Sequence, residues 1–100
     1  MLKIRFCINR DLCEDDPLVD ITQGFYFGFR EYVTDERGRH GAKFLAYGSE
    51  GYDFKYESEE FTLFPGDIYK GIWSTEEEDG PTDWYEKSYC YTVQLVETED

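Results

Sequence analysis

The stretch that decides the fold is WYEKSYCYTVQLV, residues 84–96. Every second position from residue 85 onward is mostly aromatic or aliphatic: Tyr85, Lys87, Tyr89, Tyr91, Val93 and Leu95. A period of two places successive side chains on opposite faces, which is the pattern of a strand with one buried face. The stretch therefore predicts a long β-strand near the end of the chain.

The same period recurs toward the N-terminus. It predicts strands over residues 2–8, 21–33, 42–47, 52–57, 61–64 and 68–73, separated by turns at 35–41, 48–51 and 65–67. Residues 10–20 form a polar connector with room for one helical turn, and residues 74–83 are expected to form a loop. Gly24 and Gly28 predict a bulge or a close packing contact within an aromatic strand. No 12-residue window shows a helical apolar period.

These elements predict a mainly β protein with little or no helix. About seven short strands bounded by Gly, Pro and Asp are typical of an antiparallel β-sandwich or a partly open barrel. A length of 100 residues indicates a single domain, residues 1–100. The 19 aromatic residues exclude a disordered acidic tail, because such tails contain few aromatics.

The sequence predicts a cytoplasmic protein. Its first residues, Met-Leu-Lys-Ile-Arg-Phe, lack the apolar run of a signal peptide, and no stretch is long enough to span a membrane. Cys7, Cys13 and Cys90 form an odd set without a CxxC pair. That count favours reduced thiols over a disulfide framework.

Charge is distributed unevenly along the chain. Residues 51–100 contain 14 Asp or Glu and 3 Lys, whereas residues 1–50 contain 9 acids and 7 bases. The total of −13 exceeds the magnitude of about 2–8 that suffices for solubility in a small domain. Repulsion among so many like charges destabilises the folded chain, so the acidic half is expected to face a basic partner.

Catalytic and metal sites are not predicted. His40 is the only histidine and lies in a polar turn without a nucleophile motif beside it. Zinc spacing is absent, and the acids Glu78, Asp79 and Asp83 lack the spacing of a calcium loop. We expect neither an enzyme nor a cofactor. The net charge also disfavours direct nucleic-acid binding, and the bases of the first hairpin are expected to pair with the protein's own acids.

What remains is a set of carboxylates interleaved with aromatic residues. Aromatic anchors surrounded by charges are typical of interfaces with oppositely charged proteins. The expected partner-binding residues are Asp53, Glu57, Glu59, Glu60, Asp67, Trp73, Glu76, Glu77, Glu78, Asp79, Asp83, Trp84 and Glu86.

The leading hypothesis is a small acidic inhibitor of a basic protein that acts on nucleic acid. One form is an immunity protein that blocks a nuclease-type toxin, and the other is a phage-type DNA mimic that blocks restriction or CRISPR machinery. The bias of the acids to one half of the chain favours immunity. A hypothesis of another class is a carbohydrate-binding β-sandwich that uses Trp73 and Trp84 as stacking platforms. A structural subunit of a larger assembly is a third possibility.

Overall fold

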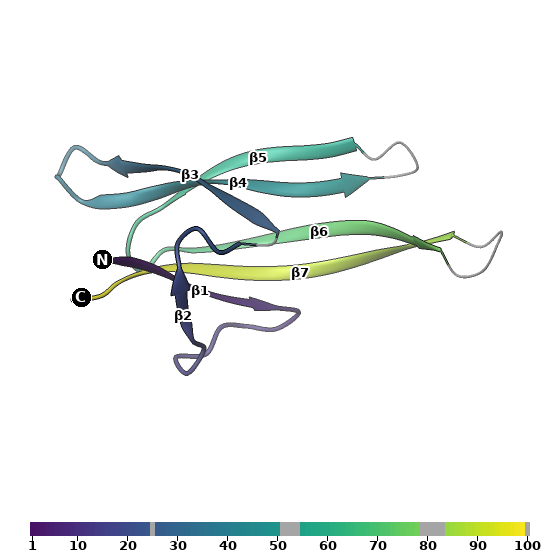
Figure 1. The fold of residues 1–100 in the computed structure, drawn as a ribbon, viewed down its shortest axis with the longest axis horizontal. Coiled ribbons are helices and arrows are strands. Elements are labelled where there is room, and N and C mark those ends of the chain that lie inside the picture. The colour runs from purple at the N-terminus through teal and green to yellow at the C-terminus, as the bar shows by residue number, and fades with distance from the viewer. Residues whose placement is uncertain (25, 51–54, 79–83, 100) are drawn as a thin grey trace.

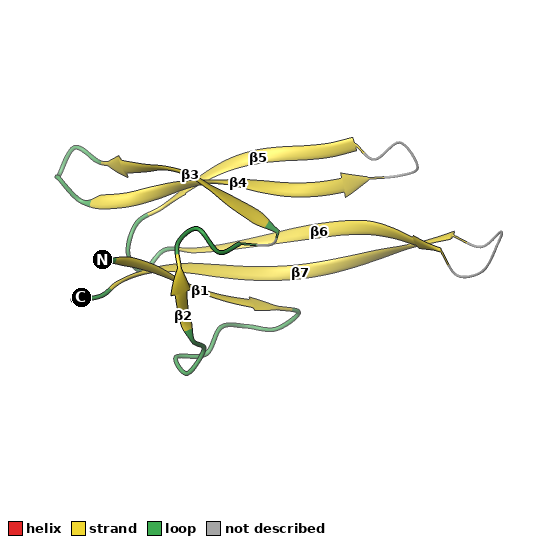
Figure 2. Cartoon of the chain, viewed as in Figure 1, coloured by secondary structure: helices red, strands yellow, loops and turns green. Residues whose placement is uncertain are grey.

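The structure is a computed structural model that describes residues 1–24, 26–50, 55–78 and 84–99. All regular structure in these ranges is β-strand, and no helix occurs in them (Figure 2). The seven strands are β1 (Leu2–Ile8), β2 (Leu18–Asp20), β3 (Phe27–Thr34), β4 (His40–Glu50), β5 (Lys55–Leu63), β6 (Ile68–Glu78) and β7 (Trp84–Glu97). The mainly β prediction is confirmed.

The strands form two antiparallel sheets that do not close into a barrel. The four-stranded sheet has the order β2-β1-β7-β6, and the three-stranded sheet has the order β3-β4-β5. The predicted sandwich or partly open barrel fits this arrangement. Strand β7 is central, because it pairs with β1 from Leu2↔Glu97 to Ile8↔Tyr91 and with β6 along its other edge. Figure 1 shows both termini at the same end of the molecule.

The core lies between the inward faces of the two sheets. Alternate residues of β7 point inward, and Tyr91, Val93 and Leu95 are at most 1% exposed. The largest buried side chains of the three-stranded sheet are aromatic, and within that sheet Phe27 packs edge-on against Phe44 at 5.7 Å between centroids. Fully burying such a side chain stabilises the fold by roughly 1.5–3 kcal/mol. The described strands of the two sheets share no ladder, so the sheets are joined by packing across the core, as where Phe27 stacks on Tyr91 of β7 at 6.0 Å between centroids.

One stacked ring pair connects the edge strands β5 and β6. The rings of Phe61 and Tyr69 lie 3.8 Å apart and are almost parallel, with an interplanar angle of 4°. The turn between these strands is the predicted one at residues 65–67, where Gly66 has a positive φ of 94°. A glycine adopts that conformation without the penalty that a side chain would cause.

The structure corrects the predicted loop at residues 74–83 for its first part, residues 74–78, while residues 79–83 lie outside the described residues. Strand β6 continues through Glu78, and its last residues pair with β7 as far as Glu78↔Trp84. Likewise, the expected strands 52–57 and 61–64 belong to one strand over the described residues 55–63. In both places a run of glutamates suggested a break. Backbone pairing overrides the low strand propensity of glutamate, because ladder hydrogen bonds do not depend on the side chain.

Other boundaries also differ from the prediction. Strand β3 begins at Phe27 instead of Ile21, and β4 includes residues 48–50 of the expected turn. The connector before β3 contains a short strand, β2, and no helix. The register shift in β3 lies between Phe29 and Glu31 and not at a glycine. Gly24 fulfils the other expectation, close packing, because a Cβ there would lie 2.3 Å from the Phe27 carbonyl oxygen.

Candidate functional site

The two longest hairpins, β4–β5 and β6–β7, extend to the same end of the molecule (Figure 1). We call this the hairpin end and define it by the strand residues 47–50, 55–60, 74–78 and 84–88. These 20 residues contain eight glutamates and two lysines, a net charge of −6. Nearly half of the total charge of −13 is therefore concentrated at one end.

Two of the predicted residues, Glu59 and Glu60, lie on the edge strand β5 and are exposed. The Glu60 carboxylate is 4.0 Å from the Lys43 ammonium, which also lies 3.4 Å from Glu31. Lys43 therefore pairs with the protein's own acids, as predicted for the first hairpin. Because such pairs are exposed, each contributes at most about 1 kcal/mol.

The exposed Glu59 of β5 lies beside Tyr69 of β6, on the other sheet. Burial raises the pKa of the Tyr69 hydroxyl, and the nearby charge of Glu59 and a hydrogen bond to that carboxylate raise it further. Burial likewise raises the pKa of the Tyr91 hydroxyl, and its hydrogen bond and charge interaction with Tyr69 raise it further. A carboxylate at the rim is thus adjacent to hydroxyls that stay protonated at neutral pH.

The predicted glutamates of the second hairpin lie in paired strands. The register places Glu76 opposite Glu86, and Glu78 opposite Trp84. Glu77 is opposite Tyr85 in the same ladder, and Glu57 is opposite Gly48 in the other hairpin. Like charges opposite one another destabilise a strand pair.

Of the predicted residues, Asp67 is not part of this surface, and three others cannot be assigned to it. Asp67 lies in the turn between β5 and β6, away from the hairpin end, where its carboxylate accepts a hydrogen bond of 2.9 Å from the Phe64 amide. That contact makes Asp67 a turn-stabilising residue. Asp53, Asp79 and Asp83 lie outside the described residues.

An aromatic cluster closes the core on the side of the hairpin end, and we define it as Tyr26, Trp73 and Tyr89. Trp73 and Tyr89 are opposite one another in the β6–β7 ladder, with ring centroids 6.1 Å apart. Tyr26 lies 5.1 Å from Trp73 and 5.8 Å from Tyr89. Tyr26 is buried, whereas the other two are half-buried. Of the three, the sequence indicated Trp73 alone, because the meeting of Tyr26 with β6 depends on tertiary packing.

A cation already contacts this aromatic cluster. The Lys87 ammonium lies 5.3 Å from the centroid of the Tyr89 ring. Lys87 is exposed and lies two residues closer to the hairpin end on the same strand, so both side chains share one face. The negative face of an aromatic ring attracts a cation at this distance.

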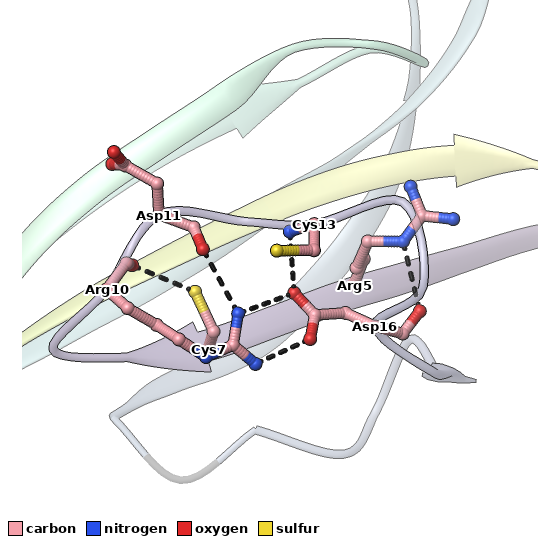
Figure 3. A network of polar contacts seen from close by, with 6 residues as sticks. All are labelled: Arg5, Cys7, Arg10, Asp11, Cys13 and Asp16. Carbon is pink, nitrogen blue, oxygen red and sulfur yellow. Dashed lines mark hydrogen bonds and ion pairs between the residues drawn. The ribbon is translucent and has the colours of Figure 1, made fainter.

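A separate polar network fastens the loop between β1 and β2 to the four-stranded sheet (Figure 3). Arg10 makes a two-pronged ion pair with Asp16, including a bond of 2.9 Å from Nη1 to Oδ2. The hydrogen bond from Arg10, with one from the Cys13 amide, lowers the pKa of Asp16 to about 2. Arg5 Nε donates to the Asp16 carbonyl oxygen at 3.1 Å. The network is structural, since its charged groups satisfy one another.

The three cysteines are free thiols. Cys7 is buried and donates to the Arg10 carbonyl oxygen at 3.1 Å, and burial raises the pKa of its thiol. A raised pKa makes a thiol less reactive at neutral pH. Cys13 and Cys90 are exposed.

The outer face of β6 and β7 borders an open groove of about 440 Å³. Lys70 and Ile72 line one side, and Arg10 and Asp11 line the other. Lys70 pairs with Asp11 at 3.3 Å, and Arg10 pairs with Asp16, so the charges of the groove are matched internally. That matching gives the groove no preference for a ligand of either sign.

The described residues show no grouping suited to catalysis by His40 or to a metal ion. His40 Nδ1 lies 3.3 Å from the Thr34 hydroxyl in the β3–β4 hairpin. No group of three or more His, Cys, Asp or Glu side chains in the described ranges could hold a metal.

Comparison with protein-family models, curated proteins and solved structures found no match. In the same ranges, no helix could cross a membrane.

Proposed function

We propose that the protein is an acidic inhibitor that docks its hairpin end onto a basic protein acting on nucleic acid. Its most direct biological form is an immunity protein that blocks a nuclease-type toxin. The observation that carries this proposal is the convergence of two hairpins, with a net charge of −6 on 20 paired residues at one end. A protein that binds nucleic acid holds phosphates with Lys and Arg, so a compact negative surface is complementary to its groove.

The shape of the hairpin end suits a cleft. The molecule measures 54 Å along its longest axis and only 17 Å along its shortest, so the hairpins project as narrow double strands. Backbone pairing holds the glutamates on a defined scaffold, which lowers the entropy lost on binding. Complementary charge of this kind raises association rates to about 10⁸–10⁹ M⁻¹s⁻¹ at low salt.

The two other hypotheses receive less support. A DNA mimic would be expected to spread its net charge over the whole surface, whereas here nearly half of the net charge lies at one end. A carbohydrate platform needs an open ring face, but Trp73 packs against Tyr26 and Tyr89 and is half-buried.

The test is a charge-reversal comparison. The variant with Glu76→Lys, Glu77→Lys and Glu78→Lys is compared with a matched control carrying Glu14→Lys, Asp15→Lys and Glu36→Lys. The control acids are exposed and lie outside the hairpin end, so both variants change the net charge equally. Immobilised proteins are used to capture host proteins at about 50 mM and about 500 mM salt. The captured proteins are then assayed for nuclease activity and for its inhibition.

We expect the wild type and the control to retain a basic protein at low salt and to inhibit its activity. The hairpin-end variant should lose both properties. If no basic protein is retained at low salt, or if both variants lose binding equally, the proposal is wrong. An enzyme of restriction or CRISPR machinery as the captured partner would identify a DNA mimic instead of an immunity protein.

A further inference from the structure

We infer that the free edge of β5 is a docking site for an extended, Lys- and Arg-rich segment of the basic partner, which adds a fourth strand to the three-stranded sheet. This inference rests on the proposed function, because it assigns how the partner engages the same acidic surface. In strand addition, main-chain hydrogen bonds supply affinity, and the side chains that flank the edge supply specificity.

The edges of the two sheets differ in how readily they accept another strand. Edge strand β2 has only three residues, and edge strand β3 is interrupted by a register shift between Phe29 and Glu31. Short strands and bulges are features that protect an edge against pairing. Strand β5 has neither feature, because its register with β4 continues without a shift over nine pairs, residues 55–63.

The backbone of β5 offers hydrogen-bonding groups along this edge. In the part of the chain that the structure describes, β4 is the only ladder partner of β5. Every second residue of an edge strand directs its N–H and C=O groups away from the sheet. A strand of nine residues is about 30 Å long, so the edge has room for an extended segment of similar length.

Acidic side chains lie on both faces of this edge. Glu59 lies beside Tyr69 of the other sheet and is therefore on the inner face. Glu60 follows it on the outer face, where its carboxylate is 4.0 Å from the Lys43 ammonium. Both glutamates are exposed, and residues 56–63 contain three glutamates and no base. An incoming strand therefore meets a carboxylate on whichever face its cations lie.

These charges select the strand that the edge accepts. A second copy of the chain would bring the run at 57–60, with its three glutamates, against an identical run, and like charges opposite one another destabilise a strand pair. Opposite charges across a strand pair favour pairing by up to about 5-fold each. The edge strand β6 differs over residues 68–73, where Ile68 and Ile72 are exposed and Lys70 is the only charged residue. Charge therefore directs a basic segment to β5.

The experiment separates strand addition from general charge attraction. The probe is the peptide Thr-Lys-Lys-Val-Thr-Lys-Lys-Thr, which has lysines on both faces when it is extended. The comparison peptide has proline at the four Thr and Val positions, so it keeps the charge but lacks the N–H groups of a regular ladder. Binding is followed by NMR at about 50 mM salt, and hydrogen exchange of the backbone amides reports strand addition.

The variant Glu59→Gln with Glu60→Gln removes the two described carboxylates of the edge. The matched control, Glu14→Gln with Asp15→Asn, removes two exposed acids outside the hairpin end. We expect the lysine peptide to slow the exchange of alternate amides within residues 57–63. It should bind the edge variant about 3- to 10-fold more weakly than the control variant. Unchanged exchange in the central strand β7 of both variants would show that the fold is intact.

The proline peptide should bind more weakly than the lysine peptide and leave the exchange of β5 unchanged. Equal binding of the two peptides, or binding without slower exchange in β5, would overturn the inference. Slower exchange in β3 or β6 in place of β5 would do the same. In these cases the acidic surface still binds cations, so the proposed function would survive. If neither peptide binds at low salt, the inference and the proposed function are contradicted together.

Discussion

Replacement of Gly71 by alanine should destabilise the fold, because Tyr91 leaves no room for a side chain at position 71. Gly71 and Tyr91 are opposite one another in the β6–β7 ladder. An ideal Cβ at Gly71 would lie 2.4 Å from both Cζ and the hydroxyl oxygen of Tyr91, and 2.7 Å from Cε1. Carbon atoms in contact are normally 3.5–4.0 Å apart, so an overlap of more than about 1 Å must be relieved.

The ring of Tyr91 cannot easily move to relieve it. Tyr91 is 1% exposed, and its centroid lies 5.8 Å from that of Tyr26, 6.0 Å from Phe27 and 6.1 Å from Tyr69. Overpacking of a core of this kind costs about 1–3 kcal/mol. Alanine regains about 0.4–1 kcal/mol because it restricts the unfolded chain. We therefore expect a net loss of about 1–2 kcal/mol, or about 4–16 °C in Tm for a domain of this length.

The assay is urea unfolding monitored by tryptophan fluorescence, with the midpoint compared at constant m. Lys70→Ala is the matched control, because Lys70 is the exposed neighbour in the same strand and makes only an exposed ion pair with Asp11. It should change stability by at most about 0.5 kcal/mol. In a Tyr91→Leu background, the cost of Gly71→Ala should largely disappear, which a double-mutant cycle measures. A Gly71→Ala protein as stable as the wild type would refute the close approach.

Three further predictions concern charged and ionisable groups. The folded protein lowers the pKa of Asp16 to about 2, so the ionised carboxylate stabilises the fold at pH values above its unfolded pKa, and this stabilisation is lost as pH falls through 2. Asp16→Asn should therefore make stability, measured by urea midpoints, depend less on pH between about pH 4 and 2. A tyrosine titration by absorbance should reveal hydroxyls that ionise above the usual pH, because the pKa values of Tyr69 and Tyr91 are raised. Glu59→Gln should lower the pKa of Tyr69, and identical titration curves for the wild type and this variant would contradict the contact between Glu59 and Tyr69. The protonated hydroxyls of Tyr69 and Tyr91 contribute to stability below about pH 10, and this contribution is lost as pH rises through their pKa values in the folded protein. Asp67→Ala should lower stability by about 1 kcal/mol in urea unfolding and leave capture of the basic partner unchanged, because its carboxylate accepts a hydrogen bond from the Phe64 amide; weakened capture would place it in the interface after all.

Much of the secondary structure follows from local patterns. The alternation from Trp84 to Val96 predicted β7, that from Leu2 to Ile8 predicted β1, and the residues Pro65-Gly66-Asp67 predicted the turn before β6. A period of two is a property of consecutive residues, so it can be recognised without knowledge of the partners. Breaks within strands were predicted less well, because glutamate runs at 57–60 and 76–78 resemble loops in composition.

The candidate site shows the same division. Composition established that the second half of the chain is acidic and aromatic, and it drew attention to Trp73 and the glutamates as candidates. It could not separate Asp67, whose carboxylate bonds within a turn, from Glu59 and Glu60, which are exposed on an edge strand. The partners of Trp73 were also hidden, since Tyr26 is 47 positions away in the chain.

The sequence by itself determined that the protein is built from antiparallel strands and has a large negative charge. Both properties arise from residue types and their spacing, which are local or additive. Only the tertiary structure decided that two hairpins carry their glutamates to the same end and that Tyr26, Trp73 and Tyr89 meet beside them. Strand pairing and ring packing join residues far apart in the chain, and their geometry depends on how the whole core closes.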